Sequence, residues 1–476
     1  MKRKYRMTAV ITALLLIISV LLPSCTAEKK QPEGISRKAL AEKIDNKTQA
    51  YMTDLMDSQS SFTNNRKIAR YLMNWAGSKG IRVKEDDGIV VMNVDGSENY
   101  KNVPPTVIVC SYDEHYLEGS FSQLVPALYA VKNNEDTGRL TALFVPESGN
   151  DFSSSDKLKK RYFKKGSRVI CLSGNESAVV SEMTGGASRY EFTRSPGTVR
   201  PKNNNAYKIT IRGIKSSHID NKINSKINPI IELNTLLANL KKSNIDFEIV
   251  SFRGGKKDML YPGSCSLVIT VDEDREAAFT SRLQRRIESF DIRKKAADEG
   301  AEYTYRKVRR PSRCFSQKDS SSLVGFVYTL LEDEYRRDDE TDTLLAVCDV
   351  SYIRASGGRI RIGSAACSLD DETLSEIDEA EETLCGLSGF GYKKTASIPS
   401  WSADPENGFS DQIKKAYDSY TGKSLKIKSS VSPSNASYVS KLTDKCDILS
   451  VTVSPSTMTD LTGTIMQFLI DSNKTE

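Results

Sequence analysis

The chain has 476 residues, of which 38% are hydrophobic and 27% are charged. This length predicts two domains, and the composition is typical of a globular, soluble protein apart from one N-terminal segment. Four basic residues of that segment account for most of the formal net charge of +6. The remainder carries about +2, so we expect no nucleic-acid partner.

The N-terminus has the order of a secretory signal. Basic residues precede the apolar run "AVITALLLIISVLL", which is followed by "LLPSC". This ending resembles a bacterial lipobox, so we expect residues 1–24 to be a lipoprotein signal peptide and Cys25 to carry lipid. The polar segment 25–36 is then a tether on the outer face of a bacterial cell membrane. The alternative is an ordinary secretory signal with an incidental cysteine.

Residues 37–189 predict a layered α/β domain. The pattern predicts helices over 37–57 and over the stretch that ends before Gly80. Further predicted elements alternate, with strands at 81–84, 88–94, 106–110, 139–145 and 168–172 and helices at 120–133 and 155–164. Strands that alternate with helices favour a largely parallel sheet.

The pattern changes near residue 188, and residues 190–397 predict a separate α+β domain. Its predicted elements are strands at 206–213, 245–253 and 265–271 and helices at 228–242 and 274–290. Residues 398–476 return to the first pattern, with helices at 408–421 and 460–472 around a strand at 447–453. We therefore expect the middle domain to be an insertion between two parts of the first one.

The stretch "VIVCSYDEH", 107–115, places acids and a histidine at the end of a predicted strand, where a metal site could form. The chain has only two histidines, His115 and His218. A single weak site could use Glu114, His115, Glu147 and Asp151. A solvated polar rim is the favoured interpretation, because clustered acids with one histidine are usually plain surface. The remaining cysteines are scattered and contain no C-x-x-C pair.

Five segments in order resemble the aminoacyl-histidine dipeptidase family of dinuclear zinc peptidases. They are "RKIARYLMNWAGSKGIRVKEDDGIVVMNV", "VICLSGNESAVVSEMTGGASRYEFTR", "AYKITIRGIKSSHIDNKI", "RGGKKDMLYP" and "IPSWSADPE". The resemblance implies a zinc-peptidase-like α/β/α domain with an inserted α+β lid and dimerisation domain. It also implies a homodimer, a short peptide ligand and, in the family, two zinc ions.

The family's zinc ligands do not carry over to this chain. A retained acid falls on Glu114 and the general base on Glu147, but the ligand positions fall on Tyr112, Gly119 or Ser120, Ser148 and Ser173. The last zinc histidine belongs in "STMTDLTG", which has none, and the substrate-side glutamate reads Asn435. We therefore expect no zinc cofactor.

One residue of the family's lid is retained. In the family, a lid histidine polarises the scissile carbonyl in the partner's site, and the resemblance places His218 there. Its neighbours are altered and the lid's asparagine reads Met259, so a loop histidine without a catalytic role is the simpler interpretation.

Three functions remain after these comparisons of residues. The favoured hypothesis is a lipid-anchored, catalytically inactive dipeptidase homologue that keeps a binding or assembly role. The alternatives are a divergent active metallodipeptidase that cleaves small peptides, and a structural envelope lipoprotein without a ligand.

Overall fold

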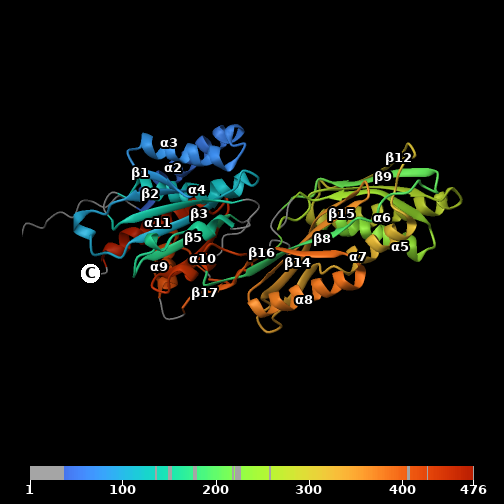
Figure 1. Cartoon of the computed structure of the whole chain (residues 1–476). Helices are drawn as coiled ribbons and strands as arrows, with labels where there is room; N and C mark the ends of the chain where they lie inside the picture. Colours follow the sequence, from blue (N-terminus) through green and yellow to red (C-terminus); the bar gives the residue numbers. More distant parts are fainter. Residues whose placement is uncertain are drawn as a thin grey trace, which may run out of the picture. The chain divides into compact units, whose positions relative to one another are not determined.

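The computed structural model describes residues 37–134, 137–147, 153–174, 180–216, 219, 227–256, 259–404, 408–425 and 427–474 (Figure 1). The predicted signal peptide, Cys25 and the tether lie outside the described residues, as do Ser148, Asp151 and His218. The first described helices are α2 (Arg37–Ser58) and α3 (Asn65–Ser78). Helix α3 begins after Asn64, whose side chain accepts a hydrogen bond from the backbone N–H of Lys67.

One sheet has seven strands in the order β1-β2-β4-β3-β5-β18-β6. These strands are β1 (Arg82–Asp86), β2 (Ile89–Val94), β3 (Thr106–Tyr112), β4 (Leu140–Pro146), β5 (Arg168–Gly174), β6 (Val180–Ser181) and β18 (Asp447–Val453). The central strands β4, β3, β5 and β18 are parallel, which confirms the predicted character of the sheet. Strand β18 comes from the far end of the chain, so the residues between β6 and β18 include an insertion.

Alternate residues of the central strands point to the two faces of this sheet. On one face, Val107, Val109, Leu143, Val145, Val169 and Cys171 form a core with Leu158, Phe163 and Val439 of α10 (Ala436–Leu442). On the other side, α4 (Leu117–Lys132) contacts β3 and β5, and α11 (Met458–Asp471) contacts both α4 and α9 (Phe409–Thr421). Layers on both sides of a largely parallel sheet make an α/β/α arrangement.

The helix predicted over 155–164 is wrong. The segment contains two short 3-10 turns, η3 (Ser153–Lys157) and η4 (Lys160–Tyr162). Among its apolar residues, Leu158 and Phe163 are the buried ones, and a spacing of five residues does not make a helical stripe.

A second sheet has nine strands and is antiparallel throughout its described pairings. Its strands are β8 (Gly186–Arg194), β9 (Asn205–Arg212), β10 (Phe247–Gly254), β11 (Cys265–Val271), β12 (Glu302–Val308), β13 (Asp333–Arg337), β14 (Leu344–Ser356), β15 (Arg359–Ser368) and β16 (Gly391–Ile398). The helices of this region are α5 (Pro229–Lys242), α6 (Glu276–Ala297), α7 (Gln317–Thr329) and α8 (Asp371–Ser388). Apolar side chains of α5, α6, α7 and α8 share one large core with the strands. The predicted fold class, an α/β/α domain with an inserted α+β domain, is confirmed.

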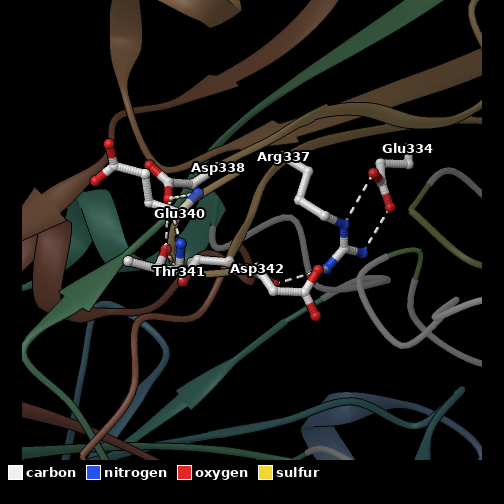
Figure 2. Close-up of polar contacts among 7 residues, drawn as sticks. Glu334, Arg337, Asp338, Glu340, Thr341 and Asp342 are labelled. Atoms are coloured by element: carbon white, nitrogen blue, oxygen red, sulfur yellow. Dashed lines mark hydrogen bonds and ion pairs between the residues drawn. The ribbon is translucent and has the colours of Figure 1, made fainter.

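Hydrogen bonds and ion pairs fix the turn between β13 and β14 (Figure 2). The Arg337 guanidinium donates to both carboxylate oxygens of Glu334, at 2.9 and 2.6 Å, and to the carbonyl of Asp342 at 2.7 Å. The Asp338 carboxylate accepts from the backbone N–H of Thr341 at 2.7 Å. Charged side chains along β13 discourage pairing with a foreign strand.

Two short strands, β7 (Met183–Thr184) and β17 (Trp401–Ser402), form a separate ladder. Among the described residues, no helix combines the length and the apolar character that a membrane span requires.

Candidate functional site

The carboxyl ends of β3 and β4 bring two predicted site residues together. The backbone N–H of Glu147, which follows β4, donates to the carbonyl of Tyr112 at 2.8 Å. Asn65, at the start of α3, accepts from the backbone N–H of Glu114 at 3.1 Å and donates to the carbonyl of Glu147. Because the carboxyl ends of parallel strands lie at the same edge of a sheet, one side chain, that of Asn65, can form hydrogen bonds with the backbones of both Glu114 and Glu147.

Tyr112 is the residue at which the sequence resemblance places a zinc-binding histidine. Its side chain is 1% exposed, and its hydroxyl has no hydrogen-bond partner among the described residues. Burial, with smaller contributions from Glu85, Cys110 and Glu114, raises the pKa of Tyr112 well above its ordinary value. The phenol is therefore neutral and is a poor ligand for a cation.

Asp113, Glu114 and His115 can bring three ligand atoms within 4.8 Å of one another. The Nε2 atom of His115 lies 3.3 Å from a carboxylate oxygen of Glu114. The Asp113 carboxylate accepts from the backbone N–H of His115 at 2.8 Å, as in an Asx turn. The group could hold one metal ion, although the His115 side chain is 49% exposed.

The first turn of α4 is packed tightly against the end of β5. A Cβ atom added to Gly174 would lie 2.5 Å from the carbonyl oxygen of Gly119, and one added to Gly119 would lie 2.0 Å from the Tyr116 ring. Ser120 ties the same turn to β3, because its hydroxyl accepts from the backbone N–H of Asp113 at 2.8 Å. Close contacts with backbone and with the Tyr116 ring therefore surround Gly119, where the resemblance expects a bridging carboxylate.

These residues do not fit a pair of zinc ions. Zinc requires about four nitrogen, sulfur or carboxylate ligands, and a catalytic ion also keeps a water position. The described positions instead hold a neutral phenol at Tyr112, a glycine and a hydroxyl at Gly119 and Ser120, and a buried hydroxyl at Ser173. Neutral hydroxyls cannot balance the charge of two dications in one cavity.

Asn435 belongs to a buried network that the sequence did not predict. Its side-chain N–H donates to the Ser111 hydroxyl at 2.8 Å, and its oxygen accepts from the Ser155 hydroxyl. The backbone N–H of Ser111 donates to the side-chain oxygen of Gln123 at 2.9 Å. The amide is bonded at both ends, so it joins segments rather than facing a substrate. No sequence signal reveals this, because the partners lie far apart along the chain.

Met259 is also a packing residue. It is 1% exposed and belongs to an apolar cluster with Ala187, Ile219 and Val347. A buried thioether does not replace the amide of the family's lid asparagine as a hydrogen-bonding group.

A cavity of about 590 Å³ lies beside Tyr112. Its lining contains both positively and negatively charged side chains. The lining residues are Asn65, Arg66, Ala69, Arg70, Met73, Asn74, Glu85, Asp87, Gly88, Tyr112, Pro146 and Lys157. Arg66 and Arg70 are four residues apart on α3, and therefore point to one side of the helix.

The crystal structure of aminoacylhistidine dipeptidase from Vibrio alginolyticus aligns with this chain over 90% of this chain and 98% of the dipeptidase. The TM-score is 0.59 and the sequence identity is 14%. This chain has the fold of aminoacylhistidine dipeptidase. At that identity the likeness establishes the fold alone.

Other dipeptidases resemble the chain less. A dipeptidase from Saccharomyces cerevisiae and human carnosine dipeptidase 1 both align over 92% of this chain and 99% of their own, each with a TM-score of 0.49, at 12% and 9% identity. No protein-family model and no curated protein matches the sequence.

Proposed function

We propose that this protein is a lipid-anchored homologue of the aminoacyl-histidine dipeptidases that has lost catalysis and retains a role in binding short peptides. The observation that carries the loss of catalysis is the contact of Gly174 with Gly119, together with hydroxyl groups at the zinc-ligand positions. Removal of one ligand or one of its supporting partners typically costs 10–100-fold in metal affinity or activity. Here the replacements affect both ions of the family's pair.

Glu147 does not restore the activity in this proposal. A general base of a zinc peptidase takes its proton from a metal-bound water, whose pKa the ion lowers to about 7. Without such an ion, a carboxylate at this position has no comparably acidic water to deprotonate. Its 2% exposure also keeps Glu147 away from bulk water.

The cavity beside Tyr112 supports the binding role. Arg66, Arg70 and Lys157 suit the carboxylate of a short peptide, and Glu85 and Asp87 suit its ammonium group. A cavity lined by positive and negative side chains suits a zwitterion better than an anion. We therefore propose that the short peptide binds in this cavity.

A second candidate function rests on the three ligand atoms of Asp113, Glu114 and His115. One metal ion held there would give a divergent metallodipeptidase. Three adjacent residues, of which Asp113 is buried and His115 is exposed, make a weak site, because the peptide backbone constrains how all three approach one ion. We therefore favour the inactive homologue.

A hydrolysis assay tests the proposal. The purified chain is incubated with aminoacyl-histidine dipeptides in excess zinc, manganese or cobalt, beside the variants Glu147→Gln and His115→Ala. We expect no turnover above a buffer blank. Turnover that Glu147→Gln abolishes would establish an active peptidase, and loss with His115→Ala would assign the metal to the second candidate site.

Membrane attachment through Cys25 is part of the same proposal and is tested separately. Two acyl chains give stable anchoring, whereas one is marginal. The full chain expressed in a bacterium should fractionate with membranes, and Cys25→Ala should not be lipidated. Membrane retention of an unlipidated Cys25→Ala chain would contradict the anchor.

A further inference from the structure

A second cavity lies away from the site described above, at the opposite edge of the parallel strands. Its volume is about 250 Å³, and its lining includes Pro105 and Val107 at the start of β3 and Ser167 before β5. Tyr112 and Glu147, by contrast, follow the carboxyl ends of the strands. The floor includes Asn93, Thr141 and Val107, which are aligned across β2, β4 and β3.

Basic side chains dominate the lining of this cavity. Lys84, Arg139, Arg161 and Lys164 contribute to it, and none of its lining residues is acidic. Arg161 pairs with Asp86, and Arg139 lies 3.9 Å from a carboxylate oxygen of Asp95.

The two lysines of the cavity remain available to a ligand. Within the described part of the chain, Lys84 and Lys164 form no ion pair. The Lys84 ammonium lies 5.7 Å from the centre of the Tyr162 ring. The positive charge in the cavity is therefore only partly balanced by the protein.

A buried hydroxyl also faces the cavity without a conventional partner. Ser167 is 0% exposed, and its Oγ atom has no oxygen or nitrogen partner among the described residues. The Cys446 thiol interacts with the Ser167 hydroxyl, but a thiol is a weak acceptor, and it donates to the carbonyl of Lys164 at 3.2 Å. A buried hydroxyl with only a weak acceptor is poorly satisfied, so a ligand that accepts from it would be favoured.

The turn that carries Lys164 and Ser167 is fixed by the backbone. The N–H of Ser167 donates to the carbonyl of Lys164 at 2.9 Å, and the Ser167 carbonyl accepts from the N–H of Asp447 at 3.0 Å. Gly166 has φ +76°, and its N–H donates to the carbonyl of Lys445 at 2.7 Å. The ammonium and hydroxyl donors thus come from one preorganised turn.

We propose that this cavity binds a phosphate group. Phosphate offers several acceptor oxygens and up to two negative charges, which match two guanidinium groups, two ammonium groups and a hydroxyl donor. A carboxylate has one charge and two oxygens, and leaves more of these donors unsatisfied.

An adjoining cavity makes room for an organic substituent on the phosphate. It has a volume of about 410 Å³ and shares Lys84, Asn93 and Arg139 with the first. The phosphate could belong to inorganic phosphate or to the headgroup of an anionic phospholipid. Both sources present the same oxygens to the basic residues.

Titration calorimetry on the full chain in detergent micelles at low ionic strength tests the site. One arm uses inorganic phosphate and the other uses dihexanoyl phosphatidylglycerol below its micelle concentration. Saturable binding in either arm is expected, and the arm with the higher affinity assigns the source. Absence of saturable binding in both arms would overturn the proposal.

Matched variants separate a specific site from general charge attraction. Lys84→Ala with Lys164→Ala should weaken binding about tenfold or more, and Ser167→Ala should weaken it several-fold, since each charge-assisted hydrogen bond contributes of this order. The control is Lys160→Ala with Lys165→Ala, which removes the same charge from exposed residues outside the cavity. Equal weakening in the control would show that no specific site exists.

Discussion

At the scale of single residues, two glycines meet backbone to backbone at the candidate site. Gly174 at the end of β5 has space for hydrogen only, because a Cβ atom would lie 2.5 Å from the carbonyl oxygen of Gly119. We expect Gly174→Ala to lower the free energy of unfolding by about 1–3 kcal/mol, because backbone would have to move. Urea unfolding measures the change.

Gly77→Ala is the matched control for this substitution. A Cβ atom at Gly77 would meet nothing within 4 Å, and the residue lies in helix α3. Alanine there should stabilise the chain by up to about 1 kcal/mol. If Gly174→Ala left stability unchanged, the close packing of α4 on β5 would not be present in solution.

Glu381 makes stability depend on pH. It is 1% exposed, and burial raises its pKa to about 7, against a smaller opposing effect of a hydrogen bond from the Leu331 backbone. An unfolded glutamate titrates near 4.5. Between pH 4.5 and pH 7, Glu381 is therefore protonated in the folded chain and ionised in the unfolded chain. The free energy of unfolding consequently falls as the pH rises from about 4.5 to about 7.

Glu381→Gln should remove this dependence. At pH 8 the variant should be more stable than the native chain by up to about 3 kcal/mol, and at pH 4.5 the two should be nearly equal. Urea unfolding at both pH values measures the difference. Glu379→Gln, on the exposed side of α8, is the control, and a Glu381→Gln variant with no pH-dependent gain would show that the carboxylate is solvated or paired.

At the scale of secondary structure, one side chain joins α3 to the ends of β3 and β4. Asn65 accepts from the N–H of Glu114 and donates to the carbonyl of Glu147. We expect Asn65→Ala to lower stability by about 1–3 kcal/mol, because two partly buried backbone groups lose a partner. Trp75 lies in α3, so its fluorescence during urea unfolding reports the change. Asn74 is an exposed residue of the same helix, so Asn74→Ala should change stability little. If both variants lost the same free energy of unfolding, the hydrogen bonds of Asn65 would have no special role.

The predictable elements are those with a strong local pattern. The parallel strands of the seven-stranded sheet and the helices α4, α9 and α11 follow from apolar runs and their alternation, whereas α10 was missed and the helix predicted over 155–164 is absent. Residues 291–397 received no predicted elements, although "ASGGRI" marks the β14–β15 hairpin, where Gly357 and Gly358 both have positive φ. Pairing of β8 with β16 joins residues some two hundred positions apart, which no local pattern encodes.

The candidate site was predictable in part for the same reason. Strand ends place Tyr112 and Glu147 at one edge of the sheet, so their proximity follows from the fold. The contact between Gly119 and Gly174, and the bonds of Asn65 and Asn435, depend on how separate elements pack. These features carry no sequence signature and appear only in the folded chain.

At the scale of the whole molecule, we propose that the inserted region, residues 190–397, mediates self-association. Its edge strand β12 exposes Tyr305 at 38%, and α7 exposes Tyr328 at 68%. Large exposed aromatic side chains are common at protein interfaces. Light scattering of the full chain in detergent should give the mass of a dimer after subtraction of the micelle; a monomer at every concentration would contradict this proposal.

The zinc content of the purified chain measures directly whether the zinc pair has been lost. The chain is saturated with zinc, dialysed against metal-free buffer and measured by elemental analysis. With a neutral phenol, hydroxyls and a glycine contact in place of the ligands, we predict that no zinc pair is retained. A single weak ion at Asp113, Glu114 and His115 would be lost during dialysis. Two tightly held zinc ions per chain would show that the pair is retained.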